Sequence, residues 1–116
     1  MREKIRDRQR LDHMLSALNV LISNRDRYPD NMISGDPIIF FGFVKHLEII
    51  GEAAYKLTKE FKDSHQEIEW SEIEGMRHVM VHGYYQIEKN IVISTIREDI
   101  DILRMKISEI LGNMPQ

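Results

Sequence analysis

The sequence predicts an all-α protein, and three observations support that fold class. Apolar residues recur at steps of three and four over most of the chain, which is the period of one helix face. No stretch alternates apolar and polar residues for long enough to form a half-buried strand. Turn-forming and capping residues separate the apolar stripes. We therefore expect an antiparallel, up-and-down bundle of the four-helix type, in which one helix is short.

Size and composition bound the class of protein. The 116 residues predict one domain, 1–116, and 42% hydrophobic with 30% charged residues is typical of a soluble chain. The longest apolar-rich run, 37–44, is too short to span a bilayer, and the basic start lacks the apolar core of a signal peptide. With no cysteine there is neither a disulfide nor a thiolate zinc site. We expect a cytoplasmic protein without a membrane partner.

The charge balance argues against a general nucleic-acid coat. The formal net charge is −3, whereas such a coat needs a broad basic surface; a small phosphate site remains possible. Basic residues gather at the N-terminus: Arg2, Lys4, Arg6, Arg8 and Arg10. We expect this run to be a solvated first turn or two of a helix, with a phosphate-binding strip as the alternative.

The first helix is expected over about residues 3–23. Its apolar stripe consists of Leu11, Met14, Leu15, Leu18 and Ile22. Residues 24–37 are rich in turn-forming residues and end the pattern.

The second helix is expected from Pro37 to about Phe61, with Asp36 as its cap. Its main stripe is Phe40, Val44, Leu47, Ile50, Ala54, Leu57 and Phe61, and a second flank is Phe41, Phe43, Ile49 and Ala53. A helix that is apolar over so wide an arc is buried on more than one side. It is therefore either the central helix of the bundle or part of a dimer interface.

The third helix is expected to be short, from Glu72 to about His82, and the fourth to span about 88–111. Ser71 and Glu74 have the spacing of a capping box, and Gly83 is a natural terminator. The expected core stripe of the fourth helix is Ile91, Thr95 or Ile96, Ile100, Leu103, Ile107 and Ile110.

Four residues with chemical potential fall within eight positions at the end of the third helix: Arg77, His78, His82 and Tyr84. Arginine carries a permanent charge and a planar fork of donors that suits phosphate. Histidine exchanges a proton near neutral pH, and tyrosine offers a hydroxyl on a rigid ring. The segment indicates phosphodiester chemistry or phosphate binding.

The spacing of Arg77 and His82 needs explanation. On an uninterrupted helix they lie about 140° apart around the axis and about 7.5 Å along it, so they would not meet. Either the helix unwinds at Val81-His82-Gly83, or a two-fold dimer brings two copies of the motif to one cleft.

Two structural alternatives compete with catalysis. His78 and His82 share a helix face and could bind zinc with Glu52 or Glu74, although Val79 stands where the zinc-protease motif needs glutamate. The two histidines could equally be hydrogen-bonded residues at a helix end. Alone, Arg77 would more often form a salt bridge to Glu74 or Glu52 than act in catalysis. Only the combination favours a functional site.

RNA cleavage at this segment can be written without a metal or other cofactor. His82 would act as the general base on a ribose 2′-hydroxyl, or as the acid toward the leaving 5′-oxygen. Arg77 would stabilise charge on the phosphoryl oxygens. His78 would orient RNA or share proton transfer, and Tyr84 would hold a phosphate or stack on a base. A 2′-hydroxyl nucleophile selects RNA over DNA.

The Arg77-x4-His82-Gly83-Tyr84 string resembles the Arg-x4-His-x-Tyr signature of the HEPN superfamily, and most closely its HepT branch. Three further strings resemble that family: 10–17 (RLDHMLSA), 46–54 with Leu57 (HLEIIGEAA), and 65–70 before Met76-Arg77 (HQEIEW). The polar residue that follows the arginine in the family, often asparagine, is His78 here.

The resemblance implies a ribonuclease toxin of a prokaryotic, type VII-like toxin–antitoxin pair. Members are helical-bundle homodimers in which two Arg-x4-His motifs line one cleft. The implied partner is a minimal nucleotidyltransferase antitoxin that transfers AMP to Tyr84. The added phosphate would compete with the substrate phosphate for Arg77 and His82.

The alternative is a non-catalytic module that binds a nucleotide or a partner nucleotidyltransferase. The acidic overall charge and the separation of Arg77 and His82 on a straight helix favour it. Glu52 and Asp12 are weaker candidates for the site: either carboxylate could orient Arg77 from a neighbouring helix, although such residues are usually just solvated.

Overall fold

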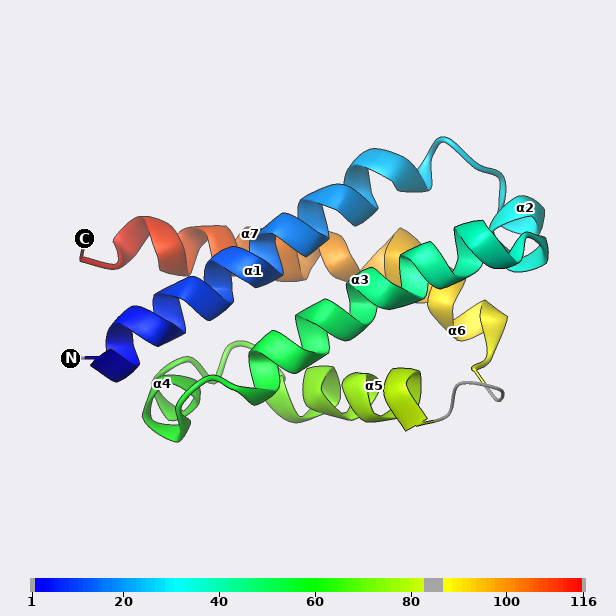
Figure 1. Cartoon of the computed structure of the whole chain (residues 1–116). Coiled ribbons are helices and arrows are strands. Elements are labelled where there is room, and N and C mark those ends of the chain that lie inside the picture. The colour runs from blue at the N-terminus through cyan, green and yellow to red at the C-terminus, as the bar shows by residue number, and fades with distance from the viewer. Residues whose placement is uncertain (1, 83–86, 116) are drawn as a thin grey trace.

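The computed structural model of the chain confirms the all-α class (Figure 1). It describes residues 2–115 except 83–86, and among these it leaves out the side chains of 2–5, 76 and 78–82. The elements are α1 (Arg2–Arg25), α2 (Asp30–Gly35), α3 (Pro37–Tyr55), α4 (Lys59–Ser64), α5 (Trp70–His82), α6 (Lys89–Ser94), the π-helical turn η2 (Thr95–Asp99) and α7 (Ile100–Asn113). The described residues form no strand, and none of their helices is long and apolar enough to cross a membrane.

The long helices α1, α3, α5 and α7 run in alternating directions, as an up-and-down bundle requires (Figure 1). α3 packs against α1 on one side and α5 on the other, and α7 lies beside α1. Because α3 has neighbours on two sides, both of its apolar flanks contribute to the core. This confirms α3 as the central helix of the bundle, one of the two roles expected for it.

The start of α3 is as predicted, but its end is not. The Asp36 carboxylate caps the helix by accepting hydrogen bonds from the amides of Ile38 and Ile39, at 2.9 and 3.2 Å. The expectation of a helix continuing to Phe61 is wrong, since α3 ends at Tyr55. Thr58 adopts extended backbone there and caps α4 by accepting from the amide of Phe61.

A buried aspartate in α1 holds this break in place. Asp7 is only 3% exposed, and its carboxylate accepts from the amide of Thr58 at 2.9 Å and from its hydroxyl at 2.7 Å. These bonds satisfy an amide that a continuous helix would have used internally. The contact is made across the bundle, which is why the local pattern does not reveal the break.

The predicted capping box at Ser71 is also wrong. α5 begins at Trp70, and the carbonyl of Glu69 accepts from the amides of Glu72 and Ile73. Trp70 is buried, and its indole NH donates to the carbonyl of His65 at 2.9 Å. Burial of this large side chain accompanies a helix start at Trp70, two residues before the Glu72 start that the capping pattern predicts.

The predicted fourth helix is a continuous helical run from Lys89 that contains the π turn η2. Thr95 and Ile96 are both buried, so neither one alone occupies the core position. The expected core residue Ile91 is 54% exposed, and Val92 is fully buried in its place. A π turn contains more residues than an α turn. The π turn η2 therefore rotates the buried face of α6 relative to the buried face of α7.

Arg97 joins η2 to the connection between α1 and α2. Its guanidinium donates to the Asp26 carboxylate, the Tyr28 carbonyl and the Asp30 carboxylate, at 3.0, 3.0 and 2.9 Å. One planar guanidinium group therefore bonds η2 to three positions between the end of α1 and the start of α2.

The N-terminal basic run is less solvated than expected. Arg6 is exposed, whereas Arg8 and Arg10 are half-buried. One nitrogen of each, Nη1 of Arg8 and Nε of Arg10, is buried and has no hydrogen-bond partner among the described residues.

Candidate functional site

The helix α5 carries most of the predicted motif. Its backbone is helical through His82, so the first of the two alternatives, an unwound helix, is wrong for Val81 and His82. Arg77 and His82 therefore stand on one straight helix, about 140° apart around its axis. The side chains of His78 and His82, and the whole of Tyr84, lie outside the described residues.

Arg77 sits where α5 approaches α3 most closely. A Cβ placed on Gly51 of α3 would lie 2.9 Å from the Arg77 Cα, closer than real Cβ atoms approach, and 3.0 Å from the Arg77 backbone nitrogen, which is also unusually tight. Glycine at position 51 therefore allows the two backbones to pack at this point. The contact sets the position of the Arg77 Cα relative to α3, and therefore the point from which its side chain extends.

Two side chains of α3 then direct the Arg77 guanidinium. Its Nε donates a hydrogen bond to Oε2 of Glu52, and its Cζ lies 4.4 Å from the centre of the Tyr55 ring. No hydrogen bond joins Nη1 or Nη2 of Arg77 to another described residue. The Arg77 side chain is 25% exposed, so the outer edge of its fork can meet a phosphate from solvent.

Glu52 also contacts a second cation. Nζ of Lys56, the residue that follows the end of α3, lies 3.5 Å from Oε1 of Glu52. The hydrogen bond and the charge of Arg77 lower the pKa of Glu52, and Lys56 lowers it further, against a smaller opposing effect of burial. With Glu52 ionised, Glu52, Arg77 and Lys56 carry one net positive charge at neutral pH. This cluster suits an anionic ligand.

Of the three carboxylates considered as partners of Arg77, only one forms an ion pair with it in the structure. Oε1 of Glu74 accepts from Nζ of Lys62 of α4 at 2.6 Å, and Asp12 is exposed on α1. Arg77 instead forms its ion pair with Glu52.

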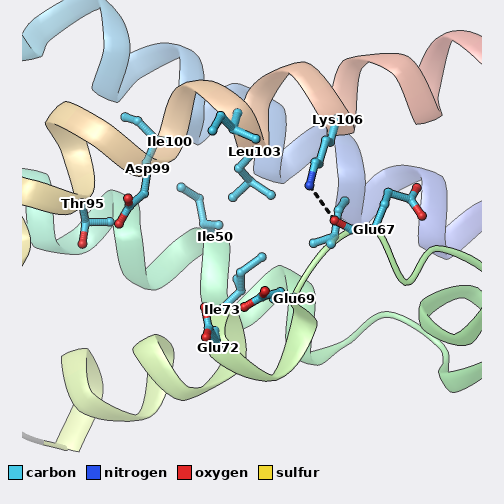
Figure 2. A pocket seen from close by; sticks show the side chains of 12 residues that line it. Ile50, Glu67, Glu69, Glu72, Ile73, Thr95, Asp99, Ile100, Leu103 and Lys106 are labelled. Carbon is cyan, nitrogen blue, oxygen red and sulfur yellow. Dashed lines mark hydrogen bonds between the residues drawn. The ribbon is translucent and has the colours of Figure 1, made fainter.

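A sizeable hollow among the described residues lies away from Arg77. A space of about 490 Å³ opens between the start of α5, η2 and α7 (Figure 2). Figure 2 shows Ile50, Ile73 and Leu103 lining it from α3, α5 and α7, with Glu69 and Glu72 on the same side as Ile73. A hydrogen bond and like charge from Glu69, with Asp99 nearby, raise the pKa of Glu72. These acidic side chains repel phosphate, so the hollow is a poor site for RNA.

The comparison with family models decides the family. Residues 11–110 match the model described as ribonuclease HepT-like. This chain belongs to that family. The match covers every element that forms the Arg77 cluster, so the arginine, its glutamate partner and the histidine all lie within the HepT-like region. It also agrees with the HEPN resemblance of the sequence.

Relatives of this HepT-like chain carry ribonuclease names. "Putative RNase TTE0752" of Caldanaerobacter subterraneus subsp. tengcongensis is 37% identical over 101 residues, covering 87% of this chain and 90% of the relative. "Probable ribonuclease HepT" of Thermococcus cleftensis is 36% identical over 70 residues, covering 60% and 64%. "Putative RNase MJ1380" of Methanocaldococcus jannaschii is 23% identical over 94 residues, covering 81% and 86%. No solved structure matches the chain significantly.

Two residues of this HepT-like site were missed by sequence reasoning. Gly51 could have been noticed as a glycine inside an otherwise apolar helix, which often marks a close backbone approach. Tyr55 follows Gly51 by four positions and Glu52 by three, so all three share one face of α3. Its contact with Arg77 depends on how α5 packs, which the local pattern does not give.

The zinc alternative remains untested. Within the described part of the chain no three histidine, aspartate or glutamate side chains group closely enough to hold a metal ion. The side chains of His78 and His82 lie outside that part.

Proposed function

We propose that this chain is a metal-independent ribonuclease that uses Arg77 and His82, the toxin of a type VII-like toxin–antitoxin pair. The observation that carries the proposal is the Arg77 cluster. Glu52 and Tyr55 hold the guanidinium, the outer edge of its fork stays open, and α5 continues five residues to His82. Family membership supports a ribonuclease.

The proposed reaction needs one nucleophile, one base, one acid and one anion-stabilising group. A histidine base removes the proton of a ribose 2′-hydroxyl, whose oxygen attacks the adjacent phosphorus. The bond from phosphorus to the 5′-oxygen breaks, and a histidine acid protonates that oxygen. The products are a 2′,3′-cyclic phosphate and a free 5′-hydroxyl. Arg77 stabilises the charge on the phosphoryl oxygens in between.

A homodimer supplies the second histidine. Within one protomer, Arg77 and His82 point to different sides of α5. A two-fold axis beside α5 would place the Arg77 and His82 side chains of both protomers along one cleft. One protomer's His82 then acts as base and its partner's as acid. In this proposal His78 orients the RNA, and Glu52 orients Arg77.

Tyr84 is the proposed site of regulation. A minimal nucleotidyltransferase antitoxin transfers AMP to its hydroxyl, and the new phosphate occupies the donors of Arg77 and His82. Both proteins would act in the cytoplasm of a prokaryote.

Expression in bacteria tests the proposal. Wild-type protein should arrest growth, and Arg77→Ala or His82→Ala should abolish the arrest at equal protein level and equal thermal stability. Arg104→Ala, at an exposed position of α7, is the matched control and should remain toxic. Toxicity that survives both site variants contradicts the proposal.

A non-catalytic binding module is the second candidate. The net charge of −3 and the unbroken helix between Arg77 and His82 favour it. Calorimetric titration with AMP or ATP separates the two candidates, because tight nucleotide binding without RNA turnover supports the module alone.

A further inference from the structure

We propose that Tyr55 is a base-stacking platform that takes an unpaired base of single-stranded RNA beside the phosphate held by Arg77. The inference rests on the proposed function, because it assigns the substrate class of the same site. Tyr55 belongs to α3, outside the Arg-x4-His-x-Tyr motif.

The exposure of Tyr55 is the first observation. Its side chain is 56% exposed, and it is the one exposed aromatic residue in the described part of the chain. The other described aromatics are buried or half-buried: Tyr28, Phe40, Phe41, Phe43, Phe61 and Trp70. An exposed aromatic ring contributes little to folding stability, because its apolar surface stays in water. The same ring contributes to binding when a ligand covers it.

The orientation of the ring is the second observation. The Arg77 guanidinium lies over the ring with its Cζ 4.4 Å from the centre. No ring of another described residue packs against Tyr55. A base stacked on the remaining ring surface would belong to a nucleotide whose phosphate lies near the outer edge of the Arg77 fork. Base and phosphate of one nucleotide are then bound by neighbouring side chains.

Charge around the ring supports a nucleotide rather than an apolar ligand. Glu52 is matched by Arg77 and Lys56, so the surroundings of Tyr55 carry net positive charge. Stacking also demands an unpaired base, because a base within a duplex is already covered on both faces. The inferred substrate is therefore an unpaired RNA segment, such as a loop or an end.

Two substitutions distinguish the contribution of the aromatic ring from that of the hydroxyl group and of apolar bulk. Tyr55→Phe keeps the aromatic face, and Tyr55→Leu keeps apolar bulk without it. Because the position is exposed, both variants should fold, and thermal unfolding verifies this. On a short single-stranded RNA, Tyr55→Leu should raise KM at least about fivefold with a smaller change in kcat, and Tyr55→Phe should stay near wild type.

A direct binding measurement complements the kinetics. The probe is a short 2′-O-methyl RNA that carries the fluorescent base 2-aminopurine at several positions and cannot be cleaved through a 2′-hydroxyl. Stacking on Tyr55 should quench its fluorescence with wild type and Tyr55→Phe, but not with Tyr55→Leu.

The outcomes distinguish this inference from the proposed function. Equal KM and equal quenching for wild type and Tyr55→Leu overturn the platform while the ribonuclease stands. Quenching that needs the ring, in a protein that cleaves no RNA, overturns the ribonuclease while the platform stands. A loss of partner-protein binding in Tyr55→Leu, with RNA binding unchanged, would assign the ring to a protein contact and overturn the platform.

Discussion

At the scale of single residues, one face of α3 determines how Arg77 is presented. Gly51 sets the distance between the backbones, Glu52 binds Nε, and Tyr55 lies beneath the guanidinium. Tyr55 follows Glu52 by three positions and Gly51 by four, which places it beside both on the surface of the helix. A substitution that removes the Gly51 or the Glu52 contact should therefore alter the position of the Arg77 side chain.

Gly51→Ala should damage both stability and activity. The added methyl group would collide with the backbone of Arg77, so α5 must move away from α3. We expect a loss of about 1–3 kcal/mol in the free energy of unfolding, measured by chemical denaturation, and slower RNA cleavage. Gly42→Ala in the same helix is the control: a Cβ there meets nothing within 4 Å, so stability should stay level or rise by up to about 1 kcal/mol. Equal stability of the two variants would contradict the tight contact.

The Glu52 ion pair should make stability depend on pH. Because the folded-state pKa of Glu52 lies below its ordinary value of 4.5, its contribution is present above pH 4.5 and is lost as the pH falls through the folded-state pKa. Glu52→Gln should therefore be less stable than wild type at pH 7 by up to about 1 kcal/mol, since the pair is partly exposed, and the gap should close below pH 4.5. Glu109→Gln, at an exposed site on α7, should show no such gap. A gap that persists unchanged at acidic pH would refute this.

At the scale of elements, α1, α3 and α5 were predictable and their boundaries less so. Helical periodicity located most of the core residues of α1 and α3, although it missed the buried Leu21, and the Asp36-Pro37 start of α3 followed from local capping chemistry. The break at Thr58 has a local part, because its hydroxyl caps α4, and a distant part, because Asp7 lies fifty-one positions away and no local pattern shows that contact. The π turn η2 likewise replaced Ile91 by Val92 in the core, because a change of helical pitch leaves no clear apolar signature.

Arg97 should be important for joining η2 to the connection between α1 and α2. Removing its three hydrogen-bonded contacts in Arg97→Ala should cost about 1–2 kcal/mol in the free energy of unfolding. Arg97→Lys should recover only part of this free energy, because an ammonium group cannot donate in the planar geometry by which the guanidinium reaches its three acceptors. Arg104→Ala, exposed on α7, should change stability by less than about 0.5 kcal/mol. Full recovery by lysine would show that charge alone matters.

At the scale of the whole molecule, charge separates two faces of the bundle. The hollow between α5 and α7 is lined by acidic side chains, whereas the Arg77 cluster is net positive. This separation supports the proposed local binding of a phosphate by a chain whose net charge is −3. Sequence reasoning identified Arg77 and Glu52 as candidates but could not identify the Tyr55 contact, which arises only when α5 packs on α3.

A cleft shared by two protomers predicts that activity depends on dimerisation. Sedimentation velocity should detect a dimer, and cleavage per protomer should fall on dilution as the dimer dissociates. A monomer with full activity would contradict the shared cleft and would require Arg77 and His82 to meet within one chain.

The most direct test of the central claim is cleavage of total cellular RNA by purified protein in excess chelator, with the new ends sequenced. Mass spectrometry first establishes that Tyr84 is unmodified. Wild type should produce 2′,3′-cyclic phosphate and 5′-hydroxyl ends, and His82→Ala should be slower by about a hundredfold or more. Absence of cleavage by unmodified wild type, or equal cleavage by the two proteins, would contradict the account.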